Sequence, residues 1–169
     1  SLLIFGSSEL KTSDIVTHPA NFFAGSGLQV DLVGRGSCQS IIHALAIGAQ
    51  GETLRNRQIV LITAPQSYVA EGIASDLFMA NYSQQQLLDI LADDSIPAEI
   101  KTYLSTRVQE LFDDYEADTG LTPEEGSAGD LLSAAWASGK NPWYLNPYAA
   151  LTRWLLHAKD LATSRSVVA

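Results

Sequence analysis

The sequence of 169 residues is short of several features, and each shortage excludes a class of protein. Lys and Arg together number 10 against 19 Asp and Glu, and the resulting net charge of -9 argues against a nucleic-acid partner. With Cys38 as the one cysteine, no disulfide forms within the chain, and no Cys/His cluster has the spacing of metal ligands. No apolar run approaches the ~20 residues of a membrane-spanning helix. We therefore expect no metal, no cofactor and no nucleic acid.

What the chain does contain is largely apolar. Hydrophobic residues make up 46% of it, enough for one sizeable core, so we expect one compact domain. Charged residues make up 17%, which is below the usual ~25% and is not typical of disorder. The sequence begins inside an apolar run, Ser1-Leu2-Leu3, where natural chains seldom begin. This start predicts a fragment whose N-terminal segment has been removed.

The first part of the chain has the pattern of an α/β protein. Apolar runs predict strands over residues 2–5, 28–33 and 58–63. The third run, "QIVLITA", is almost continuously apolar, as in a parallel strand buried on both faces. Residues 38–49 have apolar side chains at helical spacing and predict a crossover helix. Strand, helix and strand with short loops predict a right-handed βαβ unit and a parallel sheet.

The second part of the chain shows no strand pattern. Its apolar spacing predicts helices over residues 84–92, 96–116, 128–138 and 147–162. We expect them to pack through five side chains: Ile100, Leu104, Val108, Leu111 and Trp154. Trp136 and Trp143 are likewise interpreted as packing residues rather than as a ligand platform. The sequence thus predicts an α/β portion over residues 1–83 and a helical portion of the same domain over residues 84–169.

Small and polar residues follow each predicted strand: Gly6-Ser7-Ser8-Glu9, then residues 34–40, then residues 64–68. Loops at the carboxyl edge of an open parallel sheet are where α/β proteins bind ligands. A serine nucleophile needs donors aimed at the developing oxyanion, and backbone N–H groups beside glycine or a glutamine amide can supply them. Ser8 is therefore a candidate nucleophile, although a serine in this position also fits a helix N-cap.

Other features of the chain have plainer interpretations. Gly34-x-Gly36 approaches a dinucleotide fingerprint, but Gln39 occupies the third glycine position, and no acidic residue ends the next strand. We therefore do not expect a nicotinamide site. The three histidines are interpreted as structural: His18 as a turn residue before Pro19, His43 as a core or helix-edge residue, and His157 as part of the last helix.

Four motifs in order resemble the DltD family of D-alanyl transfer proteins. They are "FGSSEL", "THP", "VGRGSCQSIIHALAIGA" and "IVLITAPQSY", and they match that family's order and spacing across residues 4–90. The resemblance implies an SGNH-hydrolase-like three-layer fold with a parallel sheet. It also implies a place at the cell membrane, on the extracytoplasmic face, through an N-terminal anchor absent from these residues. The implied activity is transfer of D-alanine to lipoteichoic or teichoic acid.

The resemblance also assigns roles to residues. SGNH enzymes take their nucleophile from a Gly-Asp-Ser-like block after the first strand, which falls here on Gly6-Ser7-Ser8 and makes Ser8 the nucleophile. The resemblance implies as oxyanion donors the N–H groups of Ser8 and of Gly36, with Gly34 as the alternative to Gly36. The family's asparagine donor has no match, and Gln66 is the nearest candidate, with Gln39 as a second.

The catalytic Asp and His of such enzymes lie close together near the C-terminus, and this sequence holds no Asp-x-x-His. We therefore expect the base outside these residues and the fragment alone to be nearly inactive. The implied partners are the teichoic acid polymer, a D-alanyl carrier protein and a membrane-bound O-acyltransferase. A non-catalytic assembly factor and an esterase for small substrates stay open as alternatives. Missing chain would leave apolar faces exposed, which predicts self-association of the fragment.

Overall fold

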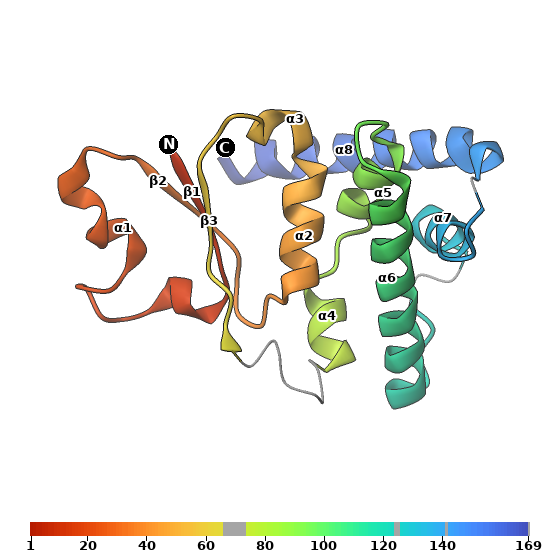
Figure 1. The fold of residues 1–169 in the computed structure, drawn as a ribbon, viewed down its shortest axis with the longest axis horizontal. Coiled ribbons are helices and arrows are strands. Elements are labelled where there is room, and N and C mark those ends of the chain that lie inside the picture. The colour runs from red at the N-terminus through yellow and green to blue at the C-terminus, as the bar shows by residue number, and fades with distance from the viewer. Residues whose placement is uncertain (66–73, 124–125, 141, 169) are drawn as a thin grey trace. The chain divides into compact units, whose positions relative to one another are not determined.

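The structure, a computed structural model, describes residues 1–65, 74–123, 126–140 and 142–168 (Figure 1), with side chains described up to residue 161. The chain divides into two compact units, Ser1–Tyr82 and Ser83–Ala169. The first is an α/β unit and the second is helical.

A parallel sheet organises the first unit. Its strands are β1 (Leu2–Phe5), β2 (Val30–Val33) and β3 (Ile59–Leu61), in the spatial order β2-β1-β3. β1 pairs in parallel with both neighbours, with Leu3 opposite Asp31 on one side and Ile59 on the other. These pairings confirm the predicted parallel α/β arrangement, with β1 at the centre.

Apolar side chains cover both faces of β1. Leu3 and Phe5 pack with Ala46 of α2 (Ser40–Ala49), the predicted crossover helix, and with Leu54 of α3 (Gly51–Leu54). On the other face, Leu2 and Ile4 pack with Leu10, Phe23 and Ile62. Figure 1 shows α2 and the short helix α1 (Pro19–Phe22) on opposite sides of the sheet. All four β1 residues are consequently buried.

The prediction that the third strand is buried on both faces is wrong. Ile59, Val60 and Leu61 are 37%, 37% and 45% exposed. The reason is topological: within the described residues β3 pairs with β1 alone, so β3 is an edge strand of this sheet. An almost continuous apolar run indicates a strand that can be buried, but it does not say what covers it.

Short helical segments complete the first unit. A 3-10 turn, η1 (Ser8–Lys11), follows β1 directly, and η2 (Ala24–Ser26) follows α1. The last element is α4 (Ser75–Asn81). Gln66 lies outside the described residues.

The second unit contains the predicted helices. They are α5 (Gln84–Ala92), α6 (Ala98–Thr119), α7 (Ala128–Ala137) and α8 (Asn146–Val168), with η4 (Trp143–Leu145) before α8. Pro97 precedes the first turn of α6, and Gly120 ends that helix in the left-handed conformation with φ 70°. Helix α6 packs along α7, and α5 contacts both α7 and α8. No described helix is both long enough and apolar enough to cross a membrane.

Three of the five predicted packing residues, Leu104, Val108 and Leu111, are buried, whereas Ile100 is 44% and Trp154 is 65% exposed. The buried face of α6 begins at Lys101 rather than at its neighbour Ile100, because the Lys101 ammonium bonds to the Leu91 carbonyl. Beside Trp154, Arg153 forms the inward contact instead, through its ion pair with Asp89. Trp143 is also exposed, so packing was the wrong interpretation for these two tryptophans.

Candidate functional site at the carboxyl edge of the sheet

The loops that follow β1 and β2 touch each other through two glycines. The Gly6 N–H donates to the Val33 carbonyl over 3.1 Å. Gly34 has φ 142°, and a Cβ atom there would lie 1.8 Å from the Gly6 carbonyl oxygen. Only glycine fits this close approach in this backbone conformation. The contact fixes the two loops side by side at the carboxyl edge of the sheet.

Ser7 is buried and links the same two loops. Its hydroxyl oxygen accepts a hydrogen bond of 3.0 Å from the backbone N–H of Cys38. Its own N–H donates to the carboxylate of Glu9. These bonds orient Ser7 toward a neighbouring backbone group, and its hydroxyl is therefore engaged in holding the loops together.

Ser8, the predicted nucleophile, is exposed and begins η1 at the end of β1. Among the described residues no hydrogen bond engages its hydroxyl. The alternative interpretation of Ser8 as a helix N-cap is wrong, because Ser7 holds the cap position of η1 and no side chain caps that turn. Adjacent serines thus have opposite environments, one buried and bonded and the other open to solvent.

The predicted oxyanion donors lie in different surroundings. Gly36 is exposed, and apart from Gly36 and its two chain neighbours no described heavy atom lies within 4 Å of the place a Cβ would occupy. Gln39 is buried, and its amide nitrogen donates to the Ala74 carbonyl over 3.5 Å. Gln66 falls outside the described residues. Convergence of the Ser8 and Gly36 N–H groups on one point stays a prediction.

Asn81, the last residue of α4, also bonds to the second loop, which the sequence did not indicate. Its amide oxygen accepts from Arg35 Nε over 2.6 Å, and its amide nitrogen donates to the carbonyls of Leu77 at 2.9 Å and Ser37 at 3.4 Å. Because both ends of the amide are engaged, Asn81 positions the loop rather than offering a free donor. No motif surrounds it, so only the tertiary structure identifies it.

His43 lies behind this site, in the core. It is buried on α2, and its ring meets Phe5 edge-on with the centroids 6.5 Å apart. Burial lowers the pKa of His43, against the opposing effect of the Glu9 carboxylate. The imidazole is therefore held toward its neutral form, in agreement with its interpretation as a core residue.

The other two histidines have structural surroundings. His18 Nδ1 accepts a hydrogen bond of 3.3 Å from the Ala20 N–H and so caps α1. In the second unit, His157 is exposed and its Nε2 lies 3.7 Å from Asp89 Oδ1. Within the part of the chain that the structure describes, no hydrogen bond joins an imidazole to Ser8. The described site presents a hydroxyl and backbone donors but no base bonded to the hydroxyl.

Fold and site together define an α/β protein whose strand-end loops present an exposed serine. The family model described as "DltD protein" matches residues 1–165, so the chain belongs to the DltD family. Protein DltD of Bacillus subtilis (strain 168) is 39% identical over 109 residues, which cover 63% of this chain and 28% of that protein. Protein DltD of Staphylococcus aureus (strain NCTC 8325 / PS 47) is 26% identical over 112 residues, covering 62% and 27%. The chain therefore aligns with under a third of the length of these relatives.

Proposed function

We propose that this chain forms part of a protein that transfers D-alanine to teichoic acid through an acyl-enzyme on Ser8. The observation that carries this proposal is the contrast between two adjacent serines at the end of β1. Ser7 is buried and accepts the Cys38 N–H, whereas Ser8 is exposed with no bond to its hydroxyl among the described residues. Membership of the DltD family supports D-alanylation as the process.

In the proposed mechanism the Ser8 oxygen attacks the carbonyl carbon of a D-alanyl ester or thioester. The negative charge that develops on the carbonyl oxygen is stabilised by N–H groups of Ser8 and Gly36, with the Gln66 or Gln39 amide as a third donor. The new O–C bond forms as the donor's C–O or C–S bond breaks, and a base outside these residues takes the serine proton. An acceptor hydroxyl on the polymer then attacks the ester and restores Ser8.

The proposal also includes the complete fold, the cellular location and the partners of the protein. An SGNH-hydrolase-like three-layer fold would extend the described parallel sheet. The protein would act on the extracytoplasmic face of the cell membrane, with a D-alanyl carrier protein and a membrane-bound O-acyltransferase as partners. Family membership is the support for this setting.

A second candidate function is a non-catalytic assembly factor that holds the polymer or the carrier while a partner performs the chemistry. One observation favours it: within the described residues no imidazole is bonded to Ser8. The two functions differ in one respect that can be measured, because only the first makes a covalent bond to Ser8.

The test uses the full-length protein in cells and in membranes, with Ser8→Ala and Ser7→Ala compared. We expect Ser8→Ala to abolish D-alanine incorporation while folding and partner binding persist. Ser7→Ala should retain part of the activity and lose about 1 kcal/mol of unfolding free energy, because the Cys38 N–H loses its partner. Full activity of Ser8→Ala, together with no labelling of Ser8 by a serine-reactive probe, would favour the assembly factor.

A further inference from the structure

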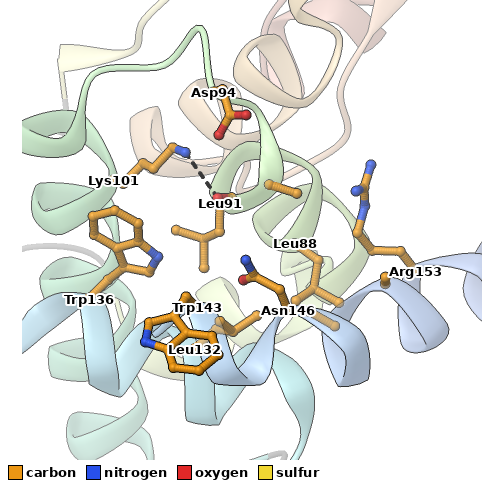
Figure 2. A pocket seen from close by; sticks show the side chains of 12 residues that line it. Leu88, Leu91, Asp94, Lys101, Leu132, Trp136, Trp143, Asn146 and Arg153 are labelled. Atoms are coloured by element: carbon orange, nitrogen blue, oxygen red, sulfur yellow. Dashed lines mark hydrogen bonds between the residues drawn. The ribbon is translucent and has the colours of Figure 1, made fainter. Parts of the chain in front are cut away.

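The helical unit contains a pocket of about 360 Å³, shown in Figure 2. Helices α5, α6, α7 and α8 all contribute to its lining, and its residues lie within the second unit. A space of this size is at the lower end of the range that holds a small organic molecule. Its lining combines cations, indoles and apolar side chains.

One end of the pocket is marked by Lys101, a lysine that is only 5% exposed. Its ammonium donates to the Leu91 carbonyl over 3.0 Å and lies 5.4 Å from the ring centroid of Trp136. An ammonium carries three donors, and within the described residues one of them has a hydrogen-bond acceptor. A buried charge is costly without an opposite charge. The pocket therefore presents a desolvated cation that an anion would complete.

A second cation, Arg153 of α8, lies on the opposite side of the pocket from Lys101 (Figure 2). Its Nε donates to Asp89 Oδ1 over 2.8 Å, which orients the guanidinium. Its two terminal nitrogens have no acceptor among the described residues. The first turn of α8, from Asn146, also lines the pocket and brings the positive end of the helix dipole to it. Two cationic side chains, Lys101 and Arg153, thus line one pocket in a chain whose net charge is -9.

The space between the two cations suits an uncharged, partly hydroxylated body. Trp136 and Trp143 supply indole surfaces, Leu91 and Leu132 supply apolar contact, and Asn146 supplies an amide. Indole faces and leucines pack against C–H groups, and an amide both donates to and accepts from hydroxyls. The one acidic side chain of the lining, Asp94, is exposed, where water screens its charge.

We propose that this pocket binds a polyol phosphodiester, with one phosphate at Lys101, a second anionic point at Arg153 and the polyol carbons against the indoles. The inference rests on the proposed function for the biological source of the ligand: it would give the acceptor polymer a binding place in the helical unit, separate from Ser8. A glycerophospholipid headgroup has the same chemistry, and the experiment below distinguishes these two sources.

The experiment titrates the chain with a synthetic glycerol phosphate trimer and follows tryptophan fluorescence and heat of binding. We expect saturable binding that weakens with added salt. Lys101→Met keeps the side-chain volume but removes the charge, and should weaken binding about tenfold or more. Arg153→Gln should weaken it less, since Asp89 already shares that charge. The matched control is Lys140→Met, an exposed lysine outside the lining, which should bind as the parent does.

Circular dichroism checks that each variant is folded, and Arg153→Gln supplies a second test should Lys101→Met not fold. Binding of the trimer but not of phosphatidylglycerol vesicles assigns the site to the polymer, and vesicle binding that Lys101→Met abolishes assigns it to a lipid headgroup. No binding, equal binding by parent and variants, or equal binding of inorganic phosphate, acetate and the trimer would overturn the proposal. Ser8→Ala should bind the trimer normally, so failure of the acyl-enzyme mechanism leaves this test unaffected.

Discussion

Gly34 lies directly against the carbonyl group of Gly6: a Cβ atom at residue 34 would stand 1.8 Å from that oxygen. These residues directly follow the central strand β1 and its neighbour β2. Their contact therefore sets how closely the loop of Ser8 approaches the loop of Gly36. Any alteration at Gly34 must move one loop away from the other.

Gly34→Ala should destabilise the chain and separate these loops. The substitution forces a side chain into a left-handed backbone with φ 142° and against a backbone oxygen, so we expect a loss of about 2–4 kcal/mol in the free energy of unfolding. Urea denaturation measures it. Gly36→Ala is the control in the same loop, where a Cβ meets open space. Equal stability of the two variants would show that the loops do not form this contact.

The burial of His43 predicts a dependence of stability on pH. Its pKa lies below 6.5 in the folded chain, mainly through desolvation and despite the Glu9 carboxylate, so the folded chain binds fewer protons than the unfolded one. The free energy of unfolding should consequently fall as pH drops through 6.5, and level off below the folded pKa. Urea denaturation at a series of pH values from about 5 to about 8, a range that brackets the ordinary histidine pKa, measures this dependence.

His43→Gln should remove this dependence of the unfolding free energy on pH. His157→Gln, at an exposed histidine, should keep it. A parent chain whose stability does not change across the histidine range would mean that His43 titrates normally and is accessible to water.

Two neighbouring turns of α6 should respond differently to truncation. Leu104 is 5% exposed and Ile100 is 44% exposed. We expect Leu104→Ala to cost about 2–4 kcal/mol, because it leaves a cavity, and Ile100→Ala to cost well under about 1 kcal/mol. Thermal or chemical unfolding distinguishes them. Comparable losses for both would restore the original expectation that Ile100 belongs to the packed face.

The exposed apolar side chains of α8 predict association of the chain with itself. Tyr148, Leu151, Trp154, Leu155 and Leu161 are between 45% and 65% exposed. We expect sedimentation velocity to show species larger than the monomer as concentration rises, because such residues are removed from water by association. Trp154→Lys should shift the distribution toward monomer, whereas Tyr103→Lys, on the exposed side of α6, should not. A monomer at all concentrations contradicts this expectation.

The local pattern of apolar residues predicted most strands and helices, but it predicted less well which side chains are buried. Residues 2–5 and the crossover helix follow from apolar spacing, and the strands pair in parallel as expected. Ile100 and Lys101 show why the rest was missed. Helical periodicity places both near the same face, and hydrophobicity favours the isoleucine, but the Leu91 carbonyl offers the lysine a partner that lies in another helix.

The same division holds for the candidate site. A glycine and two serines after an apolar run indicated a strand-end loop with Ser8 as its candidate nucleophile. The contrast between the buried, bonded Ser7 and the exposed Ser8 came from the structure. Asn81 could not be found this way, since its bonds to Arg35 and Ser37 cross more of the sequence than any local pattern spans. The pocket at Lys101 is likewise assembled from helices that no single motif connects.

The central place of β1 has a consequence for the order in which this unit can form. Leu3 must pair with Asp31 on one side and with Ile59 on the other, so the earliest of the three strands to be synthesised is the last to gain both neighbours. Contacts between residues that are far apart in the sequence form slowly. Helix pairs such as α6 and α7, in contrast, form from segments that are close in the sequence. During synthesis, the apolar β1 segment therefore lacks its second neighbour until β3 has been made, and an unpaired apolar strand of this kind is prone to aggregation.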